Sequence, residues 1–253
     1  MINHPHSEVR ATAVWNLAFH VPKQKSDFDR LGKLINTLLD DTNEKVQVWA
    51  MSALQVSPHL ATFSLEKLIL LISGHGVAND AMQILGKLKE PRAIPVLALY
   101  LQDPEKVMTA LNYLSPFGMV AAPLVPQLRA IFRGDQQVSF PLDGLERNVS
   151  HLVVQDWVTR VYESIGSGAI DALPELRVAL QKMVQSDEIG WDGKINYICG
   201  LLKAIGAMGT LAGEAKPDLI ALLDLIRAAP DKIGSGRGWL EQTLLETLKS
   251  ISS

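Results

Sequence analysis

The sequence contains few of the residues on which secreted, metal-binding and membrane proteins depend. Among its 253 residues there is one cysteine, Cys199. A single cysteine excludes an internal disulfide and fits a reducing compartment. The N-terminal segment MINHPHSEVR is polar, and no stretch approaches the roughly 20 apolar residues that span a bilayer. We therefore predict a cytoplasmic protein.

An excess of positive charge is also missing. The chain has 24 Lys and Arg against 27 Asp and Glu, which gives a formal net charge of -3. Proteins that bind nucleic acid normally carry a basic face. A nucleic-acid partner is therefore not expected.

Motifs for catalysis and metal binding are weak. The six histidines form no HExxH pair and have no cysteine companions, so we expect no metal site. The glycine-rich segment 234–238 lacks the Lys-Ser/Thr ending of a phosphate-binding loop. Asp40 and Asp41 fit a helix-capping turn better than acid/base work. We predict no catalytic residue, no cofactor and no enzymatic activity.

A short phrase recurs along the chain: an apolar stretch ends in Gly, and Pro follows before the next apolar stretch. The interval is eight residues from Gly118 to Pro126, from Gly166 to Pro174 and from Gly209 to Pro217, and nine from Gly86 to Pro95. Such recurrence predicts stacked helical hairpins.

Apolar residues in the segments between these phrases follow the helical period. In the segment from 31 to 39 they fall at i, i+3, i+4, i+7 and i+8, on one face of a helix. Alternating segments rich in β-branched residues are lacking, so no strand of consequence is expected. We predict an all-α fold, an α-solenoid with the form of a right-handed superhelix of about six helical hairpins.

Two runs resemble a known repeat family. They are LINTLLDDTNEKVQVWAMSAL and AMQILGKLKEPRAIPVLALYLQDPEKVMTALNYL, which are similar to HEAT repeats and closest to the short HEAT-like repeats of the phycobilisome lyase type. The family pattern has an Asp-rich turn followed by Val-Arg at the start of the second helix. Only Arg10 keeps the family arginine, while Gln47 and Met108 replace it, so the Asp/Arg ladder of the family should be mostly absent here.

The resemblance covers nearly the whole chain, and it implies one HEAT-like α-solenoid domain over 1–253. The interval between repeats lengthens after Pro126, which predicts loop insertions near 133–148 and 186–194. Insertions in repeat proteins tend to lie on one face and can bind partners.

The period of the second helices predicts which side chains are buried. Positions zero, four and eight of each second helix should form the core: Val9, Ala13, Leu17, Val46, Ala50, Leu54, Val77, Ala81 and Leu85. Positions three and six should face away from it: Thr12, Trp15, Trp49, Ser52, Asp80, Gln83, Ala110, Tyr113, Arg160, Glu163, Gly200 and Lys203.

Stacked hairpins usually present a concave surface to other molecules. We therefore predict a non-catalytic scaffold with a protein partner, bound by Trp15, Trp49, Asp80, Gln83, Tyr113, Arg160, Glu163 and Lys203. The alternative for Trp15 and Trp49 is that they fill gaps between repeats, since Trp is highly buried on average. The alternatives for the whole protein are a subunit like a chromophore lyase and, less favoured by the charge balance, a DNA glycosylase of the helical-repeat type.

Overall fold

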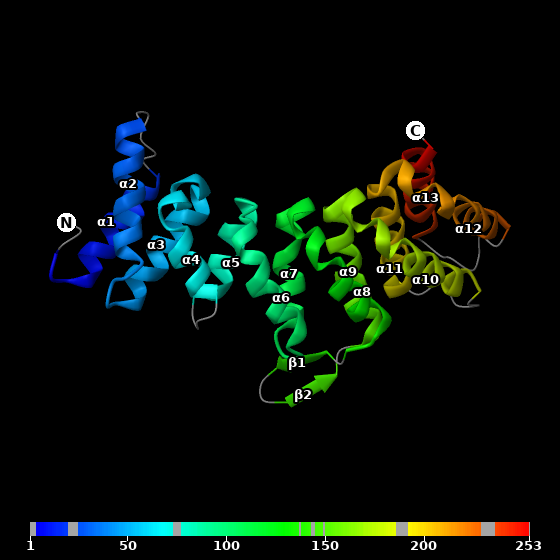
Figure 1. Cartoon of the computed structure of the whole chain (residues 1–253), viewed down its shortest axis with the longest axis horizontal. Helices are drawn as coiled ribbons and strands as arrows, with labels where there is room; N and C mark the ends of the chain where they lie inside the picture. Colours follow the sequence, from blue (N-terminus) through cyan, green and yellow to red (C-terminus); the bar gives the residue numbers. More distant parts are fainter. Residues whose placement is uncertain are drawn as a thin grey trace. The chain divides into compact units, whose positions relative to one another are not determined.

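The computed structural model describes residues 4–19, 25–72, 77–136, 138–142, 145–148, 150–185, 192–228 and 236–252. These residues are almost entirely helical, which confirms the all-α class (Figure 1). The chain divides into two compact units, Met1–Val96 and Leu97–Ser253.

The first unit consists of short α-helices and two 3-10 turns. In chain order they are α1 (Ser7–Phe19), α2 (Lys25–Leu38), α3 (Glu44–Val56), η1 (Pro58–Phe63), α4 (Leu65–Ile72), α5 (Ala78–Lys87), η2 (Pro91–Ala93) and the start of α6 (Ile94–Gln102). Helix α3 lies at the centre, because it contacts α1, α2 and α5. Its side chains Val46, Ala50 and Leu54 are completely buried. Replacing a leucine buried in this way by alanine typically costs about 2–5 kcal/mol.

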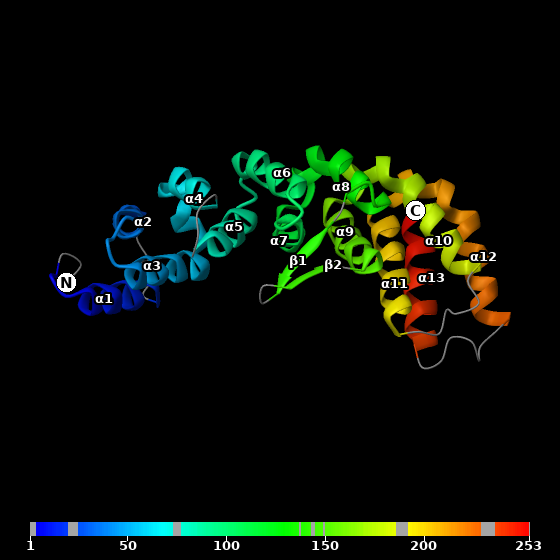
Figure 2. The same ribbon diagram turned by 90° about the horizontal axis from the view of Figure 1, so that it is seen from below.

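The second unit continues with longer helices. They are α7 (Val107–Leu114), η3 (Ser115–Leu124), α8 (Val125–Arg133), α9 (His151–Ile165), η4 (Gly166–Ala172), α10 (Leu173–Gln185), α11 (Asp192–Ala207), η5 (Gly209–Ala215), α12 (Lys216–Ala228) and α13 (Arg237–Ser252). Helix α9 packs against α7 and α11, and α11 packs against α13 (Figure 2). Helix α10 contacts α8 on one side and α12 on the other. The contacts thus alternate as expected for helical hairpins within this unit, whereas the superhelix and its hand stay a prediction.

The Gly-Pro phrase corresponds to one type of connection. Gly118, Gly166 and Gly209 have φ of 58°, 68° and 64°. After each of them the chain passes through a 3-10 segment into a helix whose second residue is proline. Glycine is needed there because a Cβ atom strains a backbone with positive φ. The proline fits because the first turn of a helix has no partner for its missing N–H.

The fourth copy of the phrase is built differently. Gly86 lies inside α5 and is buried, and Lys89 has the positive φ, at 53°. The interval from glycine to proline in this copy is nine residues instead of eight, which is the feature of the sequence that indicates the different connection.

The predicted insertion near 133–148 contains the only strands among the described residues. They are β1 (Ser139–Leu142) and β2 (Leu145–Asn148), an antiparallel pair in which Ser139 lies opposite Asn148. The expectation of no strand of consequence allows for this small hairpin of two four-residue strands, which the sequence pattern did not predict. Of the other insertion, residues 186–191 lie outside the described part of the chain.

The predicted core positions are largely correct. Ala13, Val46, Ala50, Leu54, Val77, Ala81 and Leu85 are buried. Val9 is wrong, because it is half-buried near the start of α1, and the side chain of Leu17 lies outside the described residues. Among the positions expected to face away, Ala110 is wrong, since it is completely buried. Helix α9 and segment η3 both pack against α7, which leaves no open side at this residue.

One stretch comes closer to a membrane span than the sequence reasoning allowed. Residues Val107–Arg133 reach a mean hydropathy of 1.2 over a window of span length. In the structure Gly118 breaks this stretch, with φ 58° and ψ -138°, and 44% of the apolar window is buried inside the protein. A single stretch of this length and composition is weak evidence for a membrane span, because core helices of other proteins meet the same criterion. The cytoplasmic location stays a prediction.

Candidate binding surface

Two tryptophans from neighbouring helices meet on the surface of the first unit. Trp15 of α1 and Trp49 of α3 have ring centroids 4.5 Å apart and an interplanar angle of 70°. This edge-to-face arrangement is a favourable geometry for aromatic pairs. Trp15 is 39% exposed and Trp49 is half-buried. Trp15 is therefore not a core residue, although the pair does join two helices.

The neighbours of the pair on α1 and α3 include apolar and uncharged side chains. Val56 follows Trp49 by two turns, on the same face of α3, and is 52% exposed. Thr12 and Ser52 lie one turn away on the two helices, and their hydroxyls donate to the carbonyls of Glu8 and Val48. We call Trp15, Trp49 and Val56 the tryptophan patch. An ion pair at its edge, Lys45 Nζ to Glu8 Oε1 at 2.7 Å, also links α3 to α1.

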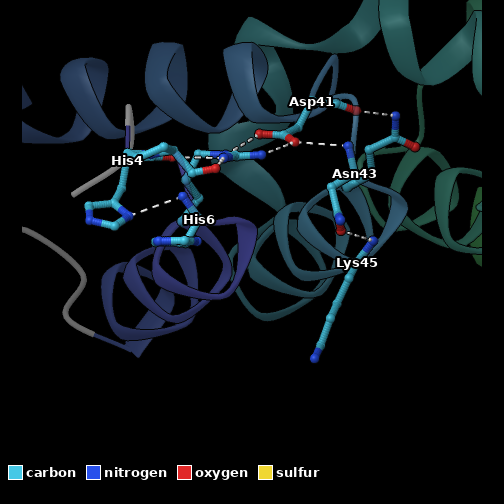
Figure 3. Close-up of polar contacts among 8 residues, drawn as sticks. His4, His6, Asp41, Asn43 and Lys45 are labelled. Carbon is cyan, nitrogen blue, oxygen red and sulfur yellow. Dashed lines mark hydrogen bonds and ion pairs between the residues drawn. The ribbon is translucent and has the colours of Figure 1, made fainter.

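An arginine and an aspartate fix the helices that carry the patch. Arg10 of α1 donates through Nε and Nη2 to the two carboxylate oxygens of Asp41, both at 2.7 Å. Its third donor, Nη1, reaches the carbonyl oxygen of His4 at 2.7 Å. Figure 3 shows this cluster with the turn that leads into α3, where Asp41 also accepts from the backbone of Asn43. Arg10, the one position that keeps the arginine of the repeat pattern, thus pairs with Asp41, whereas the assignment to HEAT-like repeats stays a prediction.

The charge on Asp41 is held by these contacts. The hydrogen bond from Arg10 lowers the pKa of Asp41 below its usual value, against the opposing effect of burial, and the backbone N–H of Asn43 lowers it further. The side chain of Asn43 in turn caps α3 by accepting from Lys45 N at 3.1 Å. The turn and the start of α3 therefore form one hydrogen-bonded unit.

The other predicted residues of the first unit, Asp80 and Gln83, are less accessible to a partner than Trp15. Asp80 of α5 accepts from Gln55 Nε2 of α3 at 2.7 Å, so its side chain bridges two helices. Gln83 is half-buried. Asp80 thus has a structural contact that the sequence pattern did not predict.

In the second unit the predicted residues lie on α7, α9 and α11. Tyr113 is half-buried, whereas Glu163 and Lys203 are exposed. Arg160 pairs with Asp156 at 2.8 Å, and its guanidinium lies 5.1 Å from the ring centroid of Trp157. The eight predicted residues therefore fall into two sets of four, one in each unit.

The sequence pattern did not predict two ion pairs that join α8 to α10 and α10 to α12. Arg129 of α8 pairs with Glu175 of α10 at 2.7 Å, and Arg177 of α10 pairs with Asp218 of α12 at 2.6 Å. In each pair the acid directly follows the proline near the start of its own helix. The arginine lies three residues after the corresponding proline of the helix before it. This spacing is the feature of the sequence from which the pairs could be predicted.

Buried groups in the second unit are held neutral. Burial raises the pKa of the Cys199 thiol, and it raises the pKa of Tyr162 and Tyr197 well above the usual value. Cys199 is buried in α11, as expected for a small core side chain. Within the described ranges no three His, Cys, Asp or Glu side chains lie close enough to hold a metal ion.

Comparison with known proteins gives no family. No family model matches the chain, and no curated protein is significantly similar. Among solved structures, one match is the crystal structure of an engineered protein from the Northeast Structural Genomics Consortium. It is 18% identical, with a TM-score of 0.35, and the match covers 98% of this chain and 94% of that chain. A similarity this low carries no argument about function.

Proposed function

We propose that the protein is a non-catalytic binding scaffold of the HEAT-like class, which presents its helical surface to a protein partner in the cytoplasm. The observation that carries this proposal is the tryptophan patch. Trp15 and Trp49 meet edge to face where solvent reaches them, and an exposed Val56 extends the apolar surface.

The patch has the composition of an interface centre. Protein interfaces are enriched in Trp, Tyr and Arg at their centre and carry charged groups at the rim. Here the uncharged patch is edged by the Glu8–Lys45 ion pair. The aromatic pair is also prepositioned, because Arg10 and Asp41 tie α1 to the turn that precedes α3. A prepositioned anchor loses less conformational freedom on binding.

The test compares three alanine variants in affinity capture with quantitative mass spectrometry. Trp15→Ala and Trp49→Ala each remove one ring of the patch. Trp239→Ala is the matched control, because Trp239 is 47% exposed but belongs to α13 in the second unit. An anchoring tryptophan typically contributes about 2 kcal/mol or more, so the affinity should fall about 30-fold.

A partner that binds through the patch is captured by the wild type and by Trp239→Ala but lost from both patch variants. Thermal unfolding checks that the patch variants stay folded. If the captured proteins are the same for all four chains, the patch is not the binding surface. If both patch variants unfold, the tryptophans are structural and the proposal is wrong.

A further inference from the structure

The second unit contains a cavity of about 610 Å³ that neither the tryptophan patch nor the ion pairs explain. It is lined by one face of α10, the last turn of α8, the first turns of α9 and Tyr197 of α11. Ligand cavities for small organic molecules are commonly about 300–1,000 Å³. The cavity is therefore large enough for a molecule of two fused rings.

The cavity exists because α8 and α10 differ in length. Helix α8 ends at Arg133, seven residues after Pro126, where Gly134 takes a left-handed conformation with φ 83°. Helix α10 continues to Gln185, eleven residues after Pro174. Lys182 and Met183, in the last part of α10, thus lie beyond the point at which α8 stops, and both line the cavity.

The inner wall is aromatic and held by hydrogen bonds. Phe132 and Tyr197 are 2% and 1% exposed. The Tyr197 hydroxyl donates to Gln155 Oε1 at 3.0 Å, and Gln155 Nε2 donates to the Phe132 carbonyl oxygen at 2.8 Å. The polar atoms of this inner layer are satisfied by one another. The apolar surface that a ligand can reach is that of Val178, which is 49% exposed, and of the half-buried Met183.

The mouth has one basic side chain without an acidic partner among the described residues. The charged residues of the lining are Arg133, Lys182 and Glu175. Arg129 and Arg133 both pair with Glu175, and Arg133 also pairs with Asp135, so these two arginines and two acids compensate one another. Lys182 is exposed and makes no ion pair within the described part of the chain. Its ammonium group is available to an anion.

We propose that this cavity binds a small organic anion with an apolar body and one carboxylate. The body lies against Val178 and Met183, in front of the buried Phe132 and Tyr197, and the carboxylate lies at the mouth beside Lys182. A neutral ligand would leave Lys182 without an anionic partner, and a cation would be repelled by it. The site is separate from the protein-binding surface proposed above.

The test uses isothermal titration calorimetry on the full chain with naphthalene-2-carboxylate as the probe. Naphthalene-2-methanol is its neutral counterpart of nearly equal size. The carboxylate should bind about tenfold more tightly than the alcohol, since ionised hydrogen-bond partners are about twice as strong as neutral ones. Lys182→Gln should remove this preference. Lys216→Gln, an exposed lysine of α12 outside the cavity, should keep it.

A second variant tests the cavity independently of charge. Val178 lines the cavity and is 49% exposed, so Val178→Trp should fill it without touching the buried Leu176 and Leu180. Both probes should lose measurable binding to this variant. The proposal is overturned if the carboxylate shows no saturable binding, if the alcohol binds equally well, or if Val178→Trp binds as the wild type does.

Discussion

Gly166 provides a sharp test of the connections between helices. It has φ 68° and ψ -134°, a region that is essentially restricted to glycine and costs other residues about 1–3 kcal/mol. A Cβ atom built on Gly166 would lie 3.3 Å from the carbonyl oxygen of Ala207, which is closer than an ordinary contact. Because this neighbour is backbone, it cannot rotate away. Gly166→Ala should therefore lower the free energy of unfolding by about 2–3 kcal/mol.

Two further glycines of the same unit separate the causes. Gly209 has φ 64°, but a Cβ atom there would meet nothing within 4 Å, so Gly209→Ala carries the backbone strain alone, about 1–2 kcal/mol. Gly213 has neither a positive φ nor a neighbour within 4 Å. Gly213→Ala should change the stability by no more than about 0.5 kcal/mol.

The assay is urea unfolding monitored by far-ultraviolet circular dichroism. The midpoints are compared between variants whose free energy of unfolding depends on the urea concentration with the same slope. The expected order of destabilisation is Gly166→Ala, then Gly209→Ala, then Gly213→Ala. An unchanged midpoint for Gly166→Ala would refute the reasoning, because the strain and the close approach would both be absent. Equal effects at Gly209 and Gly213 would show that the positive φ does not matter.

Other substitutions test the packing and the charge network. Asp41→Asn should be less stable than the wild type at pH 7. Since Arg10 lowers the folded-state pKa of Asp41, this difference in stability should shrink as the pH falls below about 4. Urea midpoints that differ equally at both pH values would contradict this. Ala110→Leu should destabilise by about 1–3 kcal/mol, because the site is completely buried, and an unchanged melting temperature would show an open site. Gly200→Val should also destabilise the protein, since a Cβ atom at this position would lie 2.7 Å from Thr159 Oγ1. Adding Thr159→Ala should raise the urea midpoint part of the way back to the wild-type value. No such rise would show that the clash is with another residue.

The helical part of the fold could be predicted because it depends on local signals. The apolar period places Val46, Ala50 and Leu54 on one face, and all three are completely buried. The proline that follows each glycine marks the second residue of α8, α10 and α12. These features need only the helix period and the steric limits of two residue types.

The failures have a different origin. Counting along α7 places Ala110 at the surface, but η3 and α9 cover it, and no count within one helix shows how many neighbours the helix has. Asp80 stays a predicted partner-binding residue, but its hydrogen bond from Gln55 of another helix is a contact that a count along α5 cannot show. The cavity depends on the unequal lengths of α8 and α10, and helix ends are the least certain part of a prediction from sequence.

The ion pairs of the second unit show why such contacts stay hidden until the helices are placed. Glu175 and Asp218 each follow a proline, at a helix start where an acid is favoured by the helix dipole alone. Their arginine partners, Arg129 and Arg177, are 46 and 41 residues earlier in the chain. These separations differ because the connecting segments differ, whereas the pairing is the same in both cases. Closing a longer loop costs little additional free energy, so the segments can vary while the contact between neighbouring helices is kept. The pairs are therefore defined by position relative to the proline, and the distance along the sequence conceals them.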